Sequence, residues 1–232
     1  MGNPRETVIL DLHLRTHYSF DSVMPPAKLL RIAKRLNLDG IAITDHGTIA
    51  GGVAARKLNR DPEFRVIVGV ELHFDVGDLV GLFVDQEIVA RDFFEAAEAI
   101  RDQGGVVILP HPFRAHKFDA GFPRDVDAIE VFNARTSPNA NRKAVLLAHR
   151  LRKPGIAVSD AHFSFEIGTA RTVFEGDNPR DAILAGPARL EASYSPRILR
   201  HASQLVKAFK LQSYRDLTQT LKEAARETID KP

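Results

Sequence analysis

Short apolar runs alternate with amphipathic stretches along most of the chain, and this alternation limits the fold more than any other feature. The apolar runs have the length and composition of buried strands, whereas the stretches between them have helical spacing. Strands that alternate with helices form a largely parallel sheet with the helices packed on the outside. The predicted strands lie at residues 8–14, 40–44, 65–71, 79–85, 106–110, 128–133, 155–162 and 170–176.

The segments between these runs predict amphipathic helices. The segment 26–37 has apolar side chains at helical spacing, and the segment 91–103 is stopped by two glycines. The segment 137–153 begins with Ser137 as N-cap and Pro138 at the first helical position. Beyond about residue 190 the pattern turns helical again, which predicts helices at 195–212 and 214–230.

Length and composition are those of one globular domain. We expect a single domain over residues 1–232, with a core at about 8–190 and a helical extension at 191–232. The chain lacks a long apolar run and the pattern of a signal peptide, so we expect a cytoplasmic protein without membrane contact. It has no cysteine, so any metal must take nitrogen and oxygen ligands. A net charge of +2 does not indicate nucleic acid as a partner, and no feature indicates an oligomeric state.

Histidine and acidic or amide residues stand at or near the ends of most of the predicted strands. They are His13, Asp45, His46, Glu71, His111, Glu130, Asn133, Asp160 and His162. A parallel barrel brings the carboxyl ends of its strands to one mouth. Imidazole and carboxylate groups bind zinc, manganese or iron, and a bridging carboxylate can hold two ions about 4 Å apart. Each residue alone has an ordinary explanation as a cap or ion-pair partner, but their joint occurrence predicts a metal centre.

The same segments, in this order, resemble the PHP (polymerase and histidinol phosphatase) superfamily. The matching segments are DLHLRTHYSFDS, ITDHGTIAGG, VGVEL, LPHPF, IEVFN and AVSDAHFSFEIGTARTVFEG. The resemblance covers residues 8 to about 176 and implies an α/β fold, a distorted seven-stranded (β/α) barrel similar to a TIM barrel, with C-terminal helices. It also implies a cleft that holds one to three divalent ions (Mn, Fe or Zn) and hydrolyses phosphate esters.

Carried over residue by residue, the resemblance implies three metal positions, and Glu71 would bridge the first two. The first would be formed by His13, Glu71, Asp160 and the residue at position 15. The second would be formed by Glu71, His111 and Asn133, which we choose over Glu130. The third would be formed by Asp21, His46 and His162.

Position 15 departs from the family's motif D-L-H-x-H, because its second histidine falls on Arg15. Arginine stays protonated and has no free lone pair, so it cannot coordinate a metal. In one outcome Arg15 binds the substrate's phosphate and the site holds fewer metals. In the other, Arg15 pairs with Glu71 or Asp160, replaces the charge of a metal and weakens or inactivates the centre. A third explanation is that Arg15 is an engineered change. We expect partial retention of the site, because every other ligand position is filled.

The expected function is hydrolysis of a phosphate monoester or diester on a small phosphorylated metabolite or nucleotide. A metal-activated hydroxide would attack phosphorus in line, and His46 or His162 could protonate the leaving oxygen. Arg114 would bind the phosphate together with Arg15, and Arg135 is a further candidate for this role.

Three other functions stay open from the sequence. A barrel impaired by Arg15 could act as a binding or regulatory module. The chain could also be a nuclease or polymerase-associated module, but it has no polymerase segments and little positive charge. An amidohydrolase would use similar ligands, but the ordered segments of the PHP superfamily argue against it.

Overall fold

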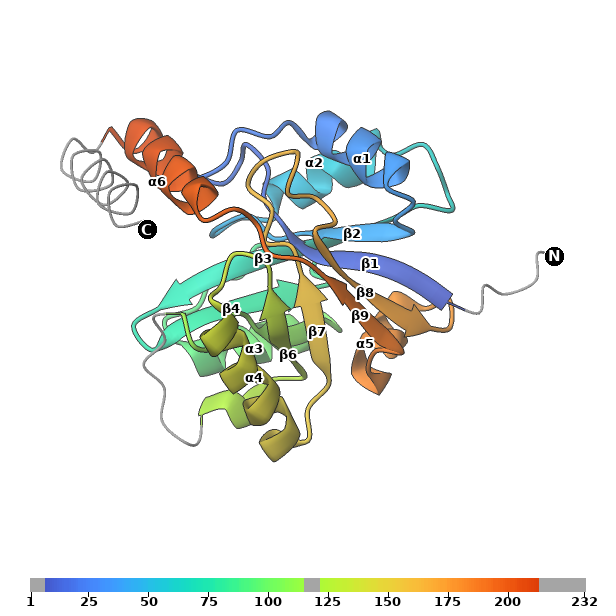
Figure 1. Ribbon diagram of the computed structural model, residues 1–232, viewed down its shortest axis with the longest axis vertical. Coiled ribbons are helices and arrows are strands. Elements are labelled where there is room, and N and C mark those ends of the chain that lie inside the picture. The colour runs from blue at the N-terminus through green and yellow to red at the C-terminus, as the bar shows by residue number, and fades with distance from the viewer. Residues whose placement is uncertain (1–6, 115–121, 213–232) are drawn as a thin grey trace, which may run out of the picture.

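A computed structural model describes residues 7–114 and 122–212, which form a mixed α/β barrel with helices around it (Figure 1). The predicted helix at 214–230 lies outside the described residues. The strands are β1 (Thr7–Leu14), β2 (Gly40–Ile43), β3 (Arg65–Phe74), β4 (Gly77–Leu82), β5 (Val106–Leu109), β6 (Ala128–Asn133), β7 (Gly155–Val158), β8 (Ala170–Glu175) and β9 (Arg189–Ala192). The helices are α1 (Pro26–Arg35), α2 (Ala50–Leu58), α3 (Phe93–Asp102), α4 (Pro138–Leu151), α5 (Pro179–Ala185), α6 (Ile198–Lys210) and the 3-10 turn η1 (Phe122–Asp125).

The sheet confirms the expected α/β barrel but has more strands than the seven that we expected. Over the described residues it has nine strands in the order β7-β6-β5-β4-β3-β2-β1-β8-β9. Neighbours pair in parallel within β1-β2-β3 and within β5-β6-β7. The difference has two causes. β4 folds back as an antiparallel hairpin between β3 and β5, and β9 adds an antiparallel edge strand to β8.

Side chains bridge the seam at which the barrel nearly closes, between β7 on one side and β1 and β8 on the other. The Thr172 hydroxyl of β8 accepts a hydrogen bond from the Ala157 backbone N–H (2.9 Å) and donates one to the Ala157 carbonyl oxygen (2.8 Å). The carboxylate of Asp11 on β1 accepts hydrogen bonds from the backbone N–H groups of Ser159 (3.1 Å) and Gly168 (2.9 Å). Burial raises the pKa of Asp11 to about 6.

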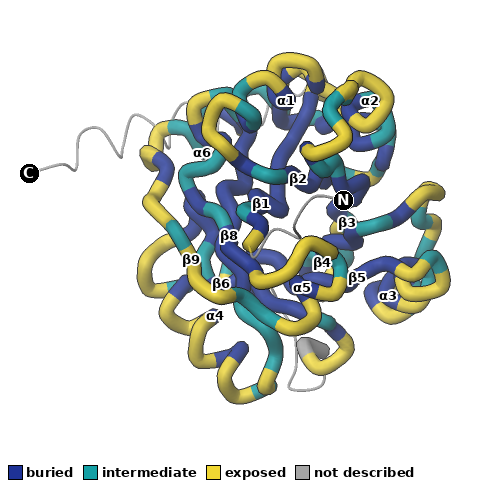
Figure 2. The backbone as a smooth tube through the Cα atoms, turned by 90° about the vertical axis from the view of Figure 1, so that its right-hand side faces the viewer, coloured by how far each residue is buried: buried dark blue, intermediate teal, exposed yellow. Residues whose placement is uncertain are grey.

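The core has an inner part and an outer part. Inside the barrel, apolar side chains from β1 to β8 meet, among them Leu10, Ile108 and Phe174. Outside, α3 and α4 bury residues such as Ile100 and Leu147 against one half of the sheet, and α1 and α2 cover the other half. Figure 2 shows the strands largely buried and the outer turns of the helices exposed. Among the described residues, no helix is long and apolar enough to cross a membrane.

Candidate metal centre

Two local irregularities in the sheet aim polar side chains at the mouth of the barrel. On β1 the pairing register shifts between Asp11 and Leu14, and on β6 it shifts between Glu130 and Phe132. In a regular strand, successive side chains alternate between the two faces of the sheet. A shift of this kind interrupts the alternation, so the residues after it lie on the opposite face from the one that strict alternation predicts. Glu130 and Asn133, three positions apart, can therefore point the same way, and the Asn133 amide donates a hydrogen bond to Glu130 (3.0 Å).

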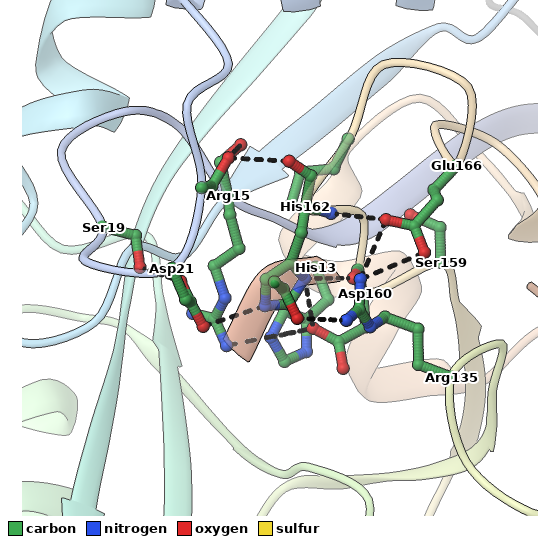
Figure 3. A network of polar contacts seen from close by, with 12 residues as sticks. His13, Arg15, Ser19, Asp21, Arg135, Ser159, Asp160, His162 and Glu166 are labelled. Atoms are coloured by element: carbon green, nitrogen blue, oxygen red, sulfur yellow. Dashed lines mark hydrogen bonds and ion pairs between the residues drawn. The ribbon is translucent and has the colours of Figure 1, made fainter. Parts of the chain in front are cut away.

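All of the predicted site residues lie in one connected network of polar contacts at this mouth. They are His13, Arg15, Asp21, His46, Glu71, His111, Arg114, Asn133, Asp160 and His162. Figure 3 shows part of the network, in which side chains from β1, from the segment after β7 and from the segment after β1 point toward one another.

The first group of ligand atoms is formed by His13, Asp160 and Glu71. The Nε2 atom of His13 lies 3.5 Å from the Oδ1 atom of Asp160 and 3.8 Å from the Oε2 atom of Glu71. His13 Nε2 and Asp160 Oδ1 are buried and have no hydrogen-bond partner among the residues that the structure describes. A buried polar atom without a partner is costly, and a divalent ion between these atoms would satisfy both. The donor set therefore fits a metal.

Glu130 orients the imidazole of His13 toward this first group of ligand atoms. Its Oε1 atom lies 2.6 Å from His13 Nδ1, which leaves Nε2 directed at the ligand group. A carboxylate on the far nitrogen is the usual support of a metal-binding histidine, because it fixes the tautomer and the ring position. Glu130 also accepts a hydrogen bond from the His111 backbone N–H (2.9 Å), so it joins two strand ends.

Asn133, which we predicted as a ligand in preference to Glu130, is fully engaged in other contacts. Its amide nitrogen donates to Glu130 (3.0 Å) and to Asp160 Oδ2 (3.2 Å). Its oxygen accepts hydrogen bonds from the Arg135 backbone N–H (3.0 Å) and from the Thr136 hydroxyl (3.3 Å). In this arrangement Asn133 holds the carboxylates in place, and its oxygen is not free to ligate.

Arg15 is buried and lies where the family motif has a histidine. One guanidinium nitrogen pairs with Glu71 Oε2, and the other donates to the Thr44 carbonyl oxygen. The first nitrogen also lies 3.9 Å from Asp160 Oδ1. This is the ion pair of the second outcome considered from the sequence. Arg15 therefore places a permanent positive charge beside the first group of ligand atoms and engages one oxygen of Glu71.

The second group uses the other oxygen of Glu71. Glu71 Oε1 lies 3.1 Å from His111 Nε2, and Asp78 Oδ2 lies 3.9 Å from His111 Nδ1. One ligand atom from each of the three residues lies within 4.8 Å of those of the other two, which is the spacing of a candidate metal site. Asp78 was not among the predicted ligands, because it stands just before the predicted strand at 79–85 and not at the end of an apolar run. The one feature that could have indicated Asp78 is its place in the hairpin that follows Glu71.

The third group converges on Asp21. Its Oδ2 atom lies 2.9 Å from His162 Nε2 and 3.3 Å from His46 Nε2. Burial alone would raise the pKa of Asp21, but the imidazoles of His162 and His46 hold it well below its usual value. Burial and the nearby charge of Arg15 lower the pKa of His46 to about 4, so this imidazole is neutral at pH 7. Neutral imidazole is the form that binds metals.

Arginines surround the centre in different roles. Arg114, about one-third exposed, donates to Asp160 Oδ2 (2.8 Å). Burial would raise the pKa of Asp160, but Arg114 and the neighbouring imidazoles, with Arg15, hold it well below its usual value. Arg135 is buried and forms two hydrogen bonds to Glu166 (2.9 and 3.1 Å), so it is a structural residue in this arrangement.

A cavity of about 580 Å³ opens above these groups. Its wall includes ligand atoms from the second and third groups, such as Asp21, His46 and Asp78. The cationic side chains that line it are Arg15, Arg114, Arg135, Arg200 and Lys207. Small-molecule sites have volumes of roughly 300–1,000 Å³, and the cavity lies within this range.

Two residues at the mouth have an unusual backbone. His111 has φ of 29° and Asp160 has φ of 52°, both in the left-handed region that residues other than glycine seldom adopt. Such conformations cost on the order of 1 kcal/mol or more, and they gather at functional sites.

The fold and these ligand groups define an α/β barrel with a candidate metal centre at its mouth, and comparison with known families places the chain more narrowly. Residues 11–148 match the model of the PHP domain, and residues 138–186 match the model of the PHP-associated C-terminal family. The chain therefore belongs to the PHP domain family.

The chain is also similar to two relatives in sequence and to a solved structure in fold. Two uncharacterized proteins of Methanocaldococcus jannaschii are similar to the chain. MJ1587 is 38% identical over 53% of this chain and 81% of its own length, and MJ0417 is 33% identical over 71% and 70%. A two-domain protein from Bacteroides vulgatus, which contains a predicted PHP-like metal-dependent phosphoesterase, has a similar fold. Its TM-score is 0.70 at 17% identity, over 83% of this chain and 67% of that chain.

Proposed function

We propose that this protein is a metal-dependent phosphoesterase that acts on a small phosphorylated molecule. The observation that carries the proposal is a pair of buried atoms that have no hydrogen-bond partner in the described part of the chain, His13 Nε2 and Asp160 Oδ1, which face each other beside Glu71. Membership of the PHP domain family supports the same class of reaction. Mn, Fe or Zn would fit the nitrogen and oxygen donors.

The residues of the chain would divide the work as follows. His13, Asp160 and Glu71 would hold one ion, and the groups around His111 and Asp21 would hold up to two more. When bound, divalent ions supply an activated water and neutralise charge on a phosphoryl group. Arg114 would bind a phosphate oxygen, because its partly exposed guanidinium group contacts Asp160 and also lines the cavity.

The substrate would be anionic and small. The cavity is lined by five cationic side chains, and its volume fits a molecule of nucleotide size or less. His162 is our candidate for proton donation to the leaving oxygen, since it lies at the cavity wall and hydrogen-bonds to Asp21. His46 is neutral at pH 7 and is better suited to ligation than to proton donation.

Metal content and hydrolysis test the proposal together. Purified protein incubated with Mn²⁺ should retain at least one ion per chain and hydrolyse p-nitrophenyl phosphate or its diester analogue. Asp160→Asn should lower both metal content and rate by about tenfold or more, because it removes a buried ligand. Asp85→Asn is the matched control at an exposed site and should change neither. A protein that binds no metal after reconstitution would contradict the proposal.

The ion pair between Arg15 and Glu71 favours a second candidate function, a barrel that binds a ligand without hydrolysing it. Arg15→His separates the two functions, because histidine restores a possible ligand and removes the charge. A rise in metal content and rate would mean that the arginine suppresses catalysis in the natural chain. A fall in rate with a raised KM would mean that Arg15 serves the substrate of an active enzyme.

A further inference from the structure

A single ammonium group at the end of α6 donates hydrogen bonds to three backbone carbonyl oxygens of the segment that follows β1. Lys210 Nζ donates to the carbonyl oxygens of His17 (2.8 Å), Ser19 (2.8 Å) and Ser22 (2.6 Å). An ammonium group has three N–H donors, so this arrangement uses all of them. The contacts join parts of the chain that are about 190 residues apart in the sequence.

The segment held by Lys210 carries Asp21, on which the third group of ligand atoms converges. Lys210 binds the backbone carbonyl oxygen of Ser19, and the Ser19 hydroxyl donates a hydrogen bond to Asp21 Oδ1 (2.6 Å). The other carboxylate oxygen of Asp21 faces His162 and His46. The position of Asp21 therefore depends on a chain of contacts that ends at Lys210.

The other end of α6 is tied to the opposite wall of the same group. Arg135 donates to the Leu199 carbonyl oxygen (3.1 Å) and to the Ser203 hydroxyl (2.5 Å) of α6. Its second nitrogen binds Glu166, which accepts a hydrogen bond from the His162 backbone N–H (3.0 Å). In Figure 3, Glu166 and Arg135 lie on one side of His162, and Asp21 lies on the other.

A third contact lies between these two ends. Lys207 Nζ stands 4.9 Å from the centre of the Phe20 ring, and Phe20 stacks on the His46 imidazole with a centroid distance of 4.5 Å. A cation above an aromatic ring is attracted to its face. α6 thus contacts the surroundings of all three residues of the third group, although it lies outside the residues that match the two family models.

We propose that α6 braces the third group of ligand atoms and that Lys210 is its positioning residue, which holds the Asp21 segment in the geometry that binds a divalent ion. This inference rests on the proposed function for the identity of the ligand. The contacts that α6 makes around Asp21, His46 and His162 are present in the chain without metal.

Hydrogen exchange in the metal-free protein tests the brace directly. Lys210→Met removes all three donors and keeps a long side chain, so the amides of His17 and Ser19 should exchange at least about tenfold faster. Those amides bond to the carbonyls of Met24 and Thr16, within the braced segment. Lys210→Arg retains donors and should restore most of the protection. Lys57→Met, at an exposed site on α2, is the matched control.

Mn²⁺ titration tests the consequence for the ligand group. Lys210→Met should lose one ion per chain, or weaken one ion by about tenfold, while the remaining ions bind as in the natural protein. Unchanged exchange and unchanged titration in Lys210→Met would overturn the inference, as would faster exchange spread over the whole chain, which indicates general destabilisation. Faster exchange at His17 and Ser19 in a protein that binds no Mn²⁺ at all would contradict the proposed function and leave the brace in place.

Discussion

At the scale of single residues, the centre is built from side chains that hold other side chains. Glu130 fixes His13, Asn133 fixes Asp160, and Arg15 fixes Glu71. Each supporting residue therefore positions a candidate ligand atom, and we expect its loss to weaken metal binding although its own side chain is not a proposed ligand.

Glu130→Gln is the sharpest test of this dependence. Glutamine keeps the size of the side chain, but it offers only one acceptor, whereas Glu130 accepts from His13, from the His111 backbone and from Asn133. We expect metal affinity to fall about 10–100-fold, as measured by competition with a chelating dye. Glu175→Gln, at an exposed site on β8, should leave the affinity unchanged. Equal affinities for both variants would argue against the orienting role of Glu130.

The sequence predicted which residues gather at the mouth, but not what each one does. His13, Glu71 and Asp160 could be found because each stands at the end of an apolar run. The roles of Glu130 and Asn133 depend on the register shift in β6, which leaves no mark in the sequence pattern. Lys210 could not be found either, since its partners are backbone carbonyls of a distant segment.

At the scale of elements, the close approach of α2 to the segment after β1 is a feature that supports the site. Gly51 lies against Asp45 and Thr16, and a Cβ atom added there would overlap the Asp45 carboxylate and the Thr16 hydroxyl. The Asp45 carboxylate accepts two hydrogen bonds of 2.6 Å from Thr16, one from its backbone N–H and one from its hydroxyl. Glycine at this position therefore lets the helix and the segment pack together.

Gly51→Ala should destabilise the protein although alanine is the better helix former. The gain in helix propensity is about 1 kcal/mol, whereas forcing a methyl group into a filled space costs about 1–3 kcal/mol and breaks the contacts of Asp45. Urea unfolding measures the difference. Lys57→Ala on the exposed face of the same helix should stay within about 0.5 kcal/mol of the natural protein. A more stable Gly51→Ala variant would mean that the space is not filled.

Some elements could not be predicted from the sequence, because their residues form no clear helical or strand pattern. α2 has two glycines near its start and few large apolar residues, so no helical face stood out. α5 and β9 are short, and β9 lies at about residue 190, where we expected the core to end and the helical extension to begin. By contrast α4, with Ser137 as N-cap and Pro138 at the first position, was predicted nearly to the residue.

At the scale of the whole molecule, the barrel depends on a seam closed by side chains. β7 and β8 are not neighbours in the sheet order, and the Thr172 hydroxyl satisfies both backbone groups of Ala157 across the gap. Thr172 is completely buried. Water therefore cannot replace the hydroxyl without a rearrangement of the core.

Thr172→Val keeps the shape of the side chain and removes these two hydrogen bonds. We expect a loss of about 1–3 kcal/mol in the free energy of unfolding, because a buried donor and acceptor lose their partner. Denaturant unfolding measures it. Thr7→Val, at an exposed position of β1, is the control and should have little effect. A Thr172→Val variant as stable as the control would show that the seam is held in some other way.

The left-handed backbone conformations of His111 and Asp160 have a consequence for how the stability of such a chain could be raised. A sequence optimised only for a durable fold would favour glycine at both positions, because glycine adopts this conformation without strain. Here an imidazole and a carboxylate occupy them instead. The protein therefore gives up some stability at these two positions, and substitution by glycine to raise heat resistance would remove two side chains of the candidate metal centre.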